Sequence, residues 1–335
     1  MKRRTLLAGG LAVGSVTAAG ASGEPWERLT RALANPSRLT TADVDQLEHD
    51  TLDHFRREEF VPARQLAQGL RLHIERLSQL LAGSPPEKLR GRLLATIGEA
   101  TALYGWFAFD RNDRSTARRF YALAASAAHD AGDTALTACV LGYRSYLAEA
   151  AGERSQARDL LAAAQQHTRA PTSAATRSWL AAREAEVRAS LHETTDALRA
   201  LDRATTAYDY ARPQHERAWT AFFSSSRLGS MAVTTFTRLD HPRLGPTADS
   251  VLEGLGPNDA KVKAIILADL ATASIHRHSY DQGADLASRA LTATTTQEVS
   301  IGADRLRGLR RLIQPHLREI GVLADLDDRL ATALV

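Results

Sequence analysis

The chain has 335 residues, of which 44% are hydrophobic and 24% charged; these proportions exclude a disordered chain and suit a globular protein or an elongated repeat protein. A low aromatic content of 6% and long stretches of Ala, Leu, Arg and Glu favour helices over β-sheets. The basic excess lies in Lys2–Arg4, so from Glu24 onward 39 basic residues balance 39 acidic ones. Because a neutral body lacks a broad positive field, we expect no direct nucleic-acid binding by this chain alone.

Residues 1–24 are predicted to be a signal-like or linker segment. Arg3 and Arg4 precede an uncharged stretch that closes with Ala19–Ala21, which is the order of a twin-arginine secretory signal. One interpretation is therefore export with cleavage near Ala21. Glycines interrupt this stretch, and no later segment approaches the roughly 20 apolar residues of a membrane span, so we expect no integral membrane insertion.

Residues 25–88 are predicted to form the N-terminal helices. A short helix over Trp26–Leu33 ends before a proline, because the residue that precedes a proline disfavours helical backbone. Thr40 or Thr41 serves as the N-cap of a second helix. A third helix follows Pro62.

Three similar segments then recur with a period of 40 residues, marked by Ala117, Ala157 and Ala197. Each alanine has a large apolar residue four positions later and another alanine seven positions later, and a polar turn separates each segment from the helix before it. Small residues at this spacing allow two helices to pack closely, as in a helical-hairpin solenoid, whose units bury their apolar faces against their neighbours. We therefore predict an all-α repeat array over residues 89–292, with C-terminal capping helices over 293–335.

The pattern resembles the tetratricopeptide repeat (TPR), with the three alanines at the small position of the second helix. Gly105 and Gly152 stand where that family often has glycine, and two weaker copies place Gly245 and Gly283 at the alanine position. The spacings of 48 and 38 residues in these copies exceed the family's usual length of about 34. The resemblance implies a TPR-like helical-hairpin solenoid.

Over roughly Pro25 to Leu330 the chain is similar to the C-terminal region of actinobacterial regulators that join an XRE-type helix-turn-helix to TPR-like repeats. The segments that carry this similarity are Glu24–Leu29, Gly105–Asp110, Leu141–Tyr143, Trp179–Glu186 and Leu267–Ala271. In such proteins the DNA-binding domain comes first, and a stretch like Arg3–Leu7 often follows it as a linker, so we expect this chain to correspond to the part that begins at the linker. The resemblance implies a cytoplasmic, regulatory peptide- or protein-binding module of a transcriptional regulatory system. The alternative is an exported TPR-like scaffold.

Motifs for catalysis are missing from the sequence, which has no nucleophile elbow, phosphate loop or HExxH pair. Cys139 is the only cysteine, and its neighbours predict a small buried hydrophobe. His276 and His278 point about 200° apart on a helix, so they cannot share a metal ion there. The polar residues over Glu48–His54 are interpreted as a solvated helix face. We expect no enzyme activity, no metal and no cofactor.

The predicted partner is a peptide or protein ligand on the concave face of the array; a homodimer is also possible. Six candidate binding residues follow from superposing the three repeats: Trp106, Tyr146 and Glu186 at equivalent inward positions, with Asp110, Glu149 and Arg183 close by. Two alternatives stay open. Trp106 and Tyr146 could be core residues, and Arg183 and Glu186 could lie exposed on the convex face. The arginines from Arg305 to Arg318 are interpreted as a solvated helix face.

Overall fold

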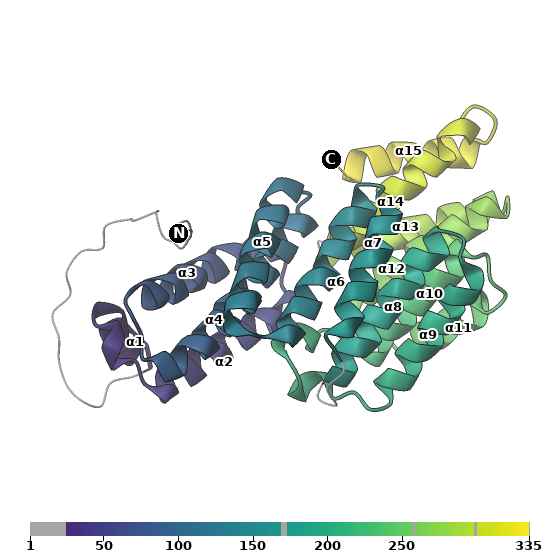
Figure 1. Ribbon diagram of the computed structural model, residues 1–335. Helices are drawn as coiled ribbons and strands as arrows, with labels where there is room; N and C mark the ends of the chain where they lie inside the picture. The colour runs from purple at the N-terminus through teal and green to yellow at the C-terminus, as the bar shows by residue number, and fades with distance from the viewer. Residues whose placement is uncertain (1–24, 169–172, 257–258, 298–299, 335) are drawn as a thin grey trace.

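Helices are the only regular elements in the part of the chain that the structure describes. The computed structural model describes residues 25–168, 173–256, 259–297 and 300–334, and these ranges contain fifteen α-helices with short 3-10 turns (Figure 1). The prediction of an all-α fold is confirmed for these residues. The predicted signal-like or linker segment lies outside them.

Three helices form the N-terminal end, as expected. Their bounds are Pro25–Ala34 (α1), Thr41–Glu58 (α2) and Ala63–Ala82 (α3). Thr40 is the N-cap of α2: its Oγ1 accepts a hydrogen bond from the backbone N–H of Asp43, and the Asp43 carboxylate accepts one from the backbone N–H of Thr40. This capping box satisfies backbone donors that the start of a helix leaves unpaired, and it fixes where α2 begins.

The other twelve helices alternate between two layers. Their bounds are Glu87–Asp110 (α4), Arg114–Ala131 (α5), Thr134–Ala150 (α6), Arg154–Gln166 (α7), Ala174–Ser190 (α8), Thr194–Tyr208 (α9), Ser225–Arg238 (α10), Leu244–Glu253 (α11), Ala260–His276 (α12), Tyr280–Gln297 (α13), Ser300–Ile313 (α14) and Gly321–Ala333 (α15). Three-residue turns reverse the chain after α4, α6, α8 and α12, and each of these helices packs on the next as an antiparallel hairpin. The helices α4, α6, α8, α10, α12 and α14 also pack on one another in that order, and we call them the inner layer.

Small residues bring the hairpins to close range. Ala117, Ala157 and Ala197 lie in α5, α7 and α9 with no exposed surface, which confirms their predicted positions. On the facing helix α4, a Cβ added at Gly105 would lie 2.6 Å from the Tyr121 ring. Because protein interiors are close-packed, a larger side chain at this position would push the two helices apart.

The two weaker repeat copies differ from each other. Gly283 lies in α13, where an added Cβ would come within 2.6 Å of Ile275, so it occupies a close-packed position as predicted. Gly245 is exposed near the start of α11, and an added Cβ there would meet nothing within 4 Å. The buried small residue is Ala248, almost one turn later. The predicted register was wrong because residues 209–224 form a long irregular connection before α10, which shifts the repeat phase.

Replacing Ala157 with Leu should destabilise the protein by about 1–3 kcal/mol, since three more carbon atoms must enter a fully packed contact of α7. Urea unfolding followed by circular dichroism measures the change. The matched control is Ala162→Leu, on the exposed side of the same helix, which should cost less than about 0.5 kcal/mol. Equal stability of the two variants would show that α7 does not pack through Ala157.

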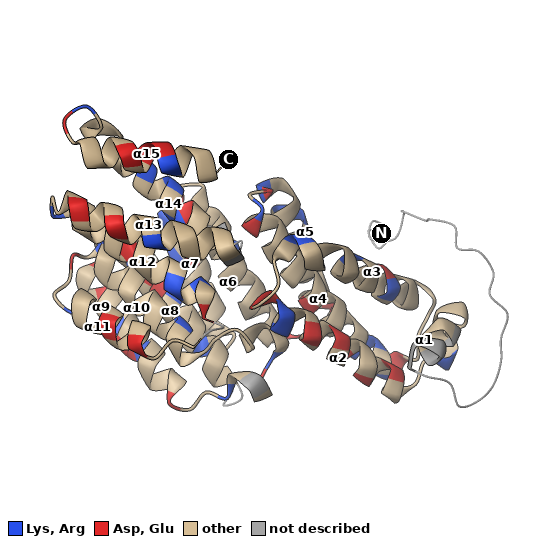
Figure 2. Ribbon diagram, turned by 180° about the vertical axis from the view of Figure 1, so that it is seen from behind, with Lys and Arg blue, Asp and Glu red and all other residues tan. Residues whose placement is uncertain are grey.

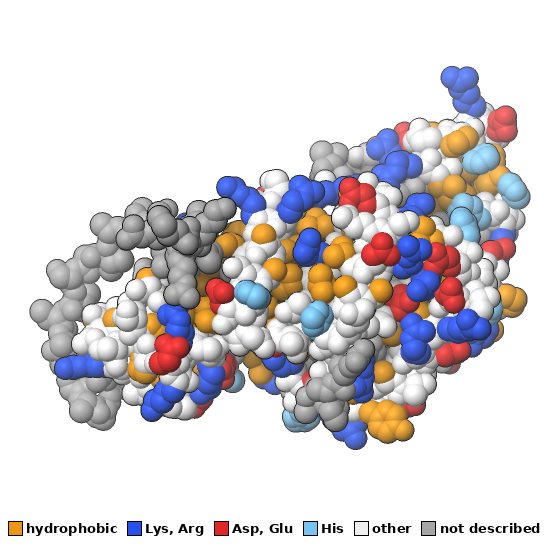
Figure 3. Space-filling view, viewed as in Figure 1, with side chains coloured by type: hydrophobic (Ala, Val, Ile, Leu, Met, Phe, Trp, Pro, Cys, Tyr) orange, Lys and Arg blue, Asp and Glu red, His pale blue; other side chains and the backbone are white. Residues whose placement is uncertain are grey.

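The surface mixes both signs of charge. In Figure 2, positions of Lys and Arg are interspersed with positions of Asp and Glu over the helices, in keeping with the balanced composition after residue 23. Figure 3 shows hydrophobic side chains exposed near the middle of the molecule, between α5 and α6, with basic side chains along the edge above them. The described part of the protein therefore has no broad electrostatic field of one sign, and candidate binding sites are defined by local clusters of side chains.

The C-terminal end of α2 contacts helices far along the chain. Lys261 of α12 donates to Glu58 Oε1 at 2.6 Å and also to the backbone carbonyl oxygen of Glu58, while Glu59 Oε1 lies 3.5 Å from Arg227 Nη2 in α10. Burial would raise the pKa of the Glu58 carboxyl, but Lys261, Arg227 and the Trp106 N–H together outweigh it and hold that pKa below its ordinary value. These contacts join α2 to the late helices of the inner layer and help to enclose the space between them.

Candidate functional site

A cavity of about 780 Å³ lies against the inner layer, with lining residues from each of its helices. Five of the six predicted site residues line it: Trp106, Tyr146, Glu149, Arg183 and Glu186. The sixth, Asp110, is the last residue of α4 and is not part of the lining. Residues separated by up to 80 positions in the sequence thus meet at one place, because α4, α6 and α8 present the same face to the cavity.

One side of the cavity is a continuous series of aromatic rings, which we call the aromatic wall. Its members are Trp106 and Phe109 of α4, Tyr143 and Tyr146 of α6, Trp179 of α8 and Phe222. Neighbouring ring centroids along it are 5.3 to 5.9 Å apart. Such contacts stabilise the rings mutually, and the wall offers an apolar ligand group a preformed surface.

Trp106 both packs on the hydrophobic core and lines the cavity. Its Nε1 donates to Glu58 Oε1 at 3.2 Å, and its ring packs on Phe109, Tyr143 and Tyr146. The Trp106 and Tyr146 side chains are only partly buried, and they line the cavity while also packing on the main hydrophobic core. The alternative that they are core residues therefore holds in part, since each ring packs on the core and also lines the cavity.

Arg183 is the centre of a buried charge network. Its Nη2 donates to Glu149 at 2.6 Å, its Nη1 to Glu186 at 2.8 Å and its Nε to Ser145 at 3.3 Å, and its Cζ lies 3.9 Å from the centre of the Tyr146 ring. The residue is only 1% exposed. The alternative of exposure on the convex face is therefore wrong for Arg183, and it is wrong for the buried Glu186 as well.

Arg238 of α10 completes this network. Its Nη1 donates to Glu149 Oε1 and to the backbone oxygen of Glu186, both at 2.7 Å. Burial alone would raise the pKa of Glu149, but the guanidiniums of Arg183 and Arg238 outweigh it and hold that pKa well below its ordinary value. Glu149 therefore stays ionised, and α6, α8 and α10 are tied together through it.

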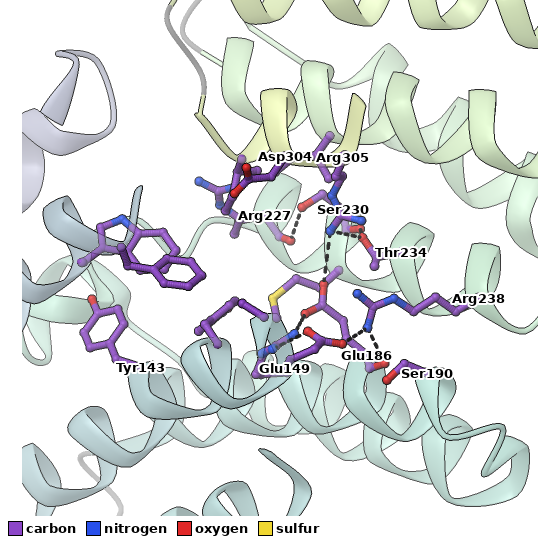
Figure 4. Close-up of a pocket in the computed structure, with 18 of the residues that line it drawn as sticks. Tyr143, Glu149, Glu186, Ser190, Arg227, Ser230, Thr234, Arg238, Asp304 and Arg305 are labelled. Carbon is purple, nitrogen blue, oxygen red and sulfur yellow. Dashed lines mark hydrogen bonds and ion pairs between the residues drawn. The ribbon is translucent and has the colours of Figure 1, made fainter. Parts of the chain in front are cut away.

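A second ion-pair cluster adjoins the first through Glu186, and the sequence analysis missed it. Arg305 of α14 donates to Asp269 Oδ1 at 2.6 Å and to Thr234 Oγ1 at 3.1 Å, and its Nη2 lies 4.0 Å from Glu186 (Figure 4). The interpretation of this arginine as part of a solvated face is wrong, because its side chain is only 25% exposed. Arg311 and Arg318 are exposed as expected.

One feature of the sequence indicates this cluster, namely an acidic residue in an apolar helix. Asp269 stands in an otherwise apolar run of α12, and burial of an unpaired carboxylate is costly, so it requires a cationic partner. The partner, Arg305, lies 36 residues further along the chain. Only the packing of α12 on α14 identifies it.

The polar residues of α2 are not all solvated. His49 and Asp53 are exposed, but both ring nitrogens of His54 are buried and have no hydrogen-bond partner in the described part of the chain. The His54 ring centroid lies 5.8 Å from that of His73 in α3, and His73 Nε2 lies 2.8 Å from Thr51 Oγ1. The predicted solvated face is therefore wrong at His54.

The structure also locates the remaining candidates for chemistry. Cys139 is buried in α6, and burial raises the pKa of its thiol well above the ordinary value. The helix α12 ends at His276, whereas His278 follows it with a φ of 61° and its Nδ1 lies 2.7 Å from Tyr280 Oη. Over the described ranges, no three His, Cys, Asp or Glu residues are grouped as metal ligands would be.

None of the described helices has both the length and the apolar character needed to cross a membrane. Comparison of the chain with models of protein families gives no match. Neither curated proteins nor solved structures include a match to this chain.

Proposed function

We propose that this protein is a regulatory peptide- or protein-binding module with a TPR-like arrangement of helical hairpins. The observation that carries the proposal is the cavity, in which an aromatic wall and charged side chains from successive inner helices face one open hollow. An extended peptide lying across the inner layer touches several of these helices in turn. Binding rather than catalysis is the proposed role.

The proposed regulatory role rests on the resemblance to XRE-type regulators with TPR-like repeats. In this proposal the protein acts in the cytoplasm and transmits peptide binding to a DNA-binding protein encoded separately. The antiparallel hairpins, with Ala117, Ala157 and Ala197 buried at their contacts, support the repeat assignment. Contacts between α2 and the late helices give a bound peptide a means to change the structure, because they lie at the edge of the same cavity.

A selection from random peptides tests the proposal. A displayed library is selected on the immobilised full chain, and the enriched peptides are synthesised and titrated against it. We expect peptide families with micromolar or tighter binding that compete with one another for one site. If no sequence is enriched over the empty matrix, peptide binding by this protein is rejected.

Replacing Trp106 with Ala should weaken binding of a selected peptide by about 2 kcal/mol, or about thirtyfold in Kd, because tryptophans in the centre of an interface commonly supply a large share of the binding energy. Isothermal titration measures the affinity. The control is Tyr210→Ala, since Tyr210 is an aromatic residue outside the cavity with 74% of its surface exposed. Unchanged affinity in a folded Trp106→Ala protein would remove the aromatic wall from the binding site.

An exported TPR-like scaffold remains the second candidate, and the signal-like order of residues 1–21 is the observation that favours it. Mass spectrometry of the protein isolated from its native cell separates the two. Export predicts a mature chain that begins near Ser22, whereas the regulatory role predicts that residues 1–21 are retained.

A further inference from the structure

The lining of the cavity carries a local excess of positive charge. Eight arginines and four carboxylates line it among the described residues, although the chain after residue 23 has equal numbers of basic and acidic residues. A concave site with walls of low dielectric constant concentrates the field of such an excess. The cavity therefore favours an anionic ligand group and disfavours a cationic one.

Three of these arginines already have strong partners within the protein. Arg183 and Arg238 share Glu149 at 2.6 and 2.7 Å, and Arg305 binds Asp269 at 2.6 Å. These distances are those of charge-assisted hydrogen bonds. Their role is to hold α6, α8, α10, α12 and α14 together, so the anion-binding capacity of the cavity lies with other arginines.

Arg227 of α10 is largely buried and incompletely paired. Its side chain is 11% exposed, and its Nη2 lies 3.5 Å from Glu59 Oε1, which is longer than the roughly 2.7–2.9 Å of a good charge-assisted hydrogen bond. Its Nε is buried and has no hydrogen-bond partner within the described residues. Arg227 lines the cavity, and a ligand carboxylate that reaches the accessible part of its guanidinium would complete a pairing that the long contact with Glu59 leaves weak.

Arg227 also stands at one end of the aromatic wall. Its Cζ lies 5.7 Å from the centre of the Phe222 ring, and Phe222 packs on Trp179, which continues the wall toward Tyr143 and Trp106. A cationic group with free donors and a large apolar surface are thus adjacent in one cavity. Their combination complements a chain that carries a carboxylate close to a large apolar side chain.

We propose that the cavity takes an acidic peptide segment, with a carboxylate on Arg227 and a large apolar side chain of the same segment on the aromatic wall. This inference rests on the proposed function and specifies its ligand. The inner layer supplies successive helices along which such a segment extends, and the lining contains no lysine or other cation in the described residues besides arginine and the histidines His192 and His276.

Three matched pools of synthetic decapeptides test the inference. All contain Gly, Ser, Leu, Phe and Trp at random positions, together with Asp and Glu in the first pool, Asn and Gln in the second and Lys and Arg in the third. Equilibrium dialysis against the full chain, read by mass spectrometry, measures retention. We expect at least tenfold greater retention of the acidic pool than of the other two, and a severalfold loss when salt rises from about 50 to about 500 mM.

Variants then locate the carboxylate. Arg227→Gln should lower retention of the acidic pool about tenfold, and Arg227→Glu should shift preference to the Lys and Arg pool. Arg199→Gln is the control, since Arg199 lies on α9 with its side chain 71% exposed, and it should bind like the wild type. Circular dichroism verifies folding, and the comparison of the three pools on the wild type decides the charge preference even if the Arg227 variants do not fold.

The outcomes separate the two proposals. Equal retention of the acidic and amide pools, or preference for the basic pool, overturns the acidic-peptide inference and leaves peptide binding in place. Retention of no pool overturns peptide binding and the inference with it. Stronger retention of a single-stranded decathymidylate than of any peptide assigns the arginines to nucleic acid and overturns the inference.

Discussion

Replacing Arg183 with Met should destabilise the protein by about 3–5 kcal/mol, which is the usual cost of breaking a buried ion pair by removing one partner. Arg183 is 1% exposed and bonds to Glu149, Glu186 and Ser145. Met has a similar length but no charge, so the Glu186 carboxylate stays buried with Arg305 Nη2 4.0 Å away as its remaining cation. Urea unfolding at pH 7 measures the loss.

Two further variants identify the cause of the loss of stability in Arg183→Met. The double variant Arg183→Met with Glu186→Gln should recover part of the stability, because the carboxylate left without its partner is then neutral while Glu149 retains Arg238. Arg199→Met, on the surface, should cost less than about 1 kcal/mol. A single variant within about 1 kcal/mol of the wild type would show that the network contributes little to stability and would return Arg183 to the role of a ligand contact.

Whether Arg183 stabilises the fold or contacts the ligand matters for function. In the proposed function the aromatic wall contacts the peptide, and in the further inference Arg227 binds its carboxylate, while the network around Arg183 shapes the cavity. All three guanidinium nitrogens of Arg183 are engaged within the protein, whereas the Nε of Arg227 has no hydrogen-bond partner among the described residues. Loss of affinity in an Arg183 variant therefore has to be separated from loss of structure, but an Arg227 variant reports on binding more directly.

The repeat spacing predicted which residues of α4, α6 and α8 share one side because one period governs α4 to α9. The buried alanines Ala117, Ala157 and Ala197 fix which side of α5, α7 and α9 packs on the preceding helix. This packing in turn determines which side of α4, α6 and α8 faces the cavity. Trp106 and Glu186 followed from that phase. At Gly245 the same argument failed, since the irregular connection before α10 breaks the period.

The other half of the site depends on how the array curves. Arg227 and Arg305 belong to helices that follow the break in the period, and their distance from Tyr146 or Glu149 is set by the packing of α10, α12 and α14 on α8. Sequence periodicity describes contacts between neighbouring units. It does not describe a cavity between units that are 80 to 160 residues apart.

Sequence periodicity also does not predict the contact between His54 and His73 at the N-terminal end. Nineteen positions separate the two histidines, and only the packing of α2 on α3 brings their ring centroids to 5.8 Å. The sequence placed His54 on a solvated face because acidic residues surround it. Its burial follows instead from its position on the side of α2 that faces α3.

Acid should destabilise the protein through His73, by roughly 3 kcal/mol between pH 7 and pH 4. Burial, assisted by the neighbouring His54, lowers the pKa of His73 from 6.5 to about 4, although Asp50 acts in the opposite direction. The unfolded chain therefore binds a proton at His73 at a higher pH than the folded protein does. The stability from this residue is fully present above about pH 6.5 and is lost as the pH falls toward 4.

The variant His73→Gln tests this expectation, because Gln can still bond to Thr51 Oγ1 but does not titrate. Urea unfolding at several pH values between 7 and 4 should show a loss of stability smaller than that of the wild type by roughly 3 kcal/mol. His129→Gln, at an exposed position of α5, should keep the full pH dependence of the wild type. If His73→Gln loses as much stability in acid as the wild type, the imidazole of His73 is not buried as a neutral group, and the packing of α2 on α3 has to be different from that described.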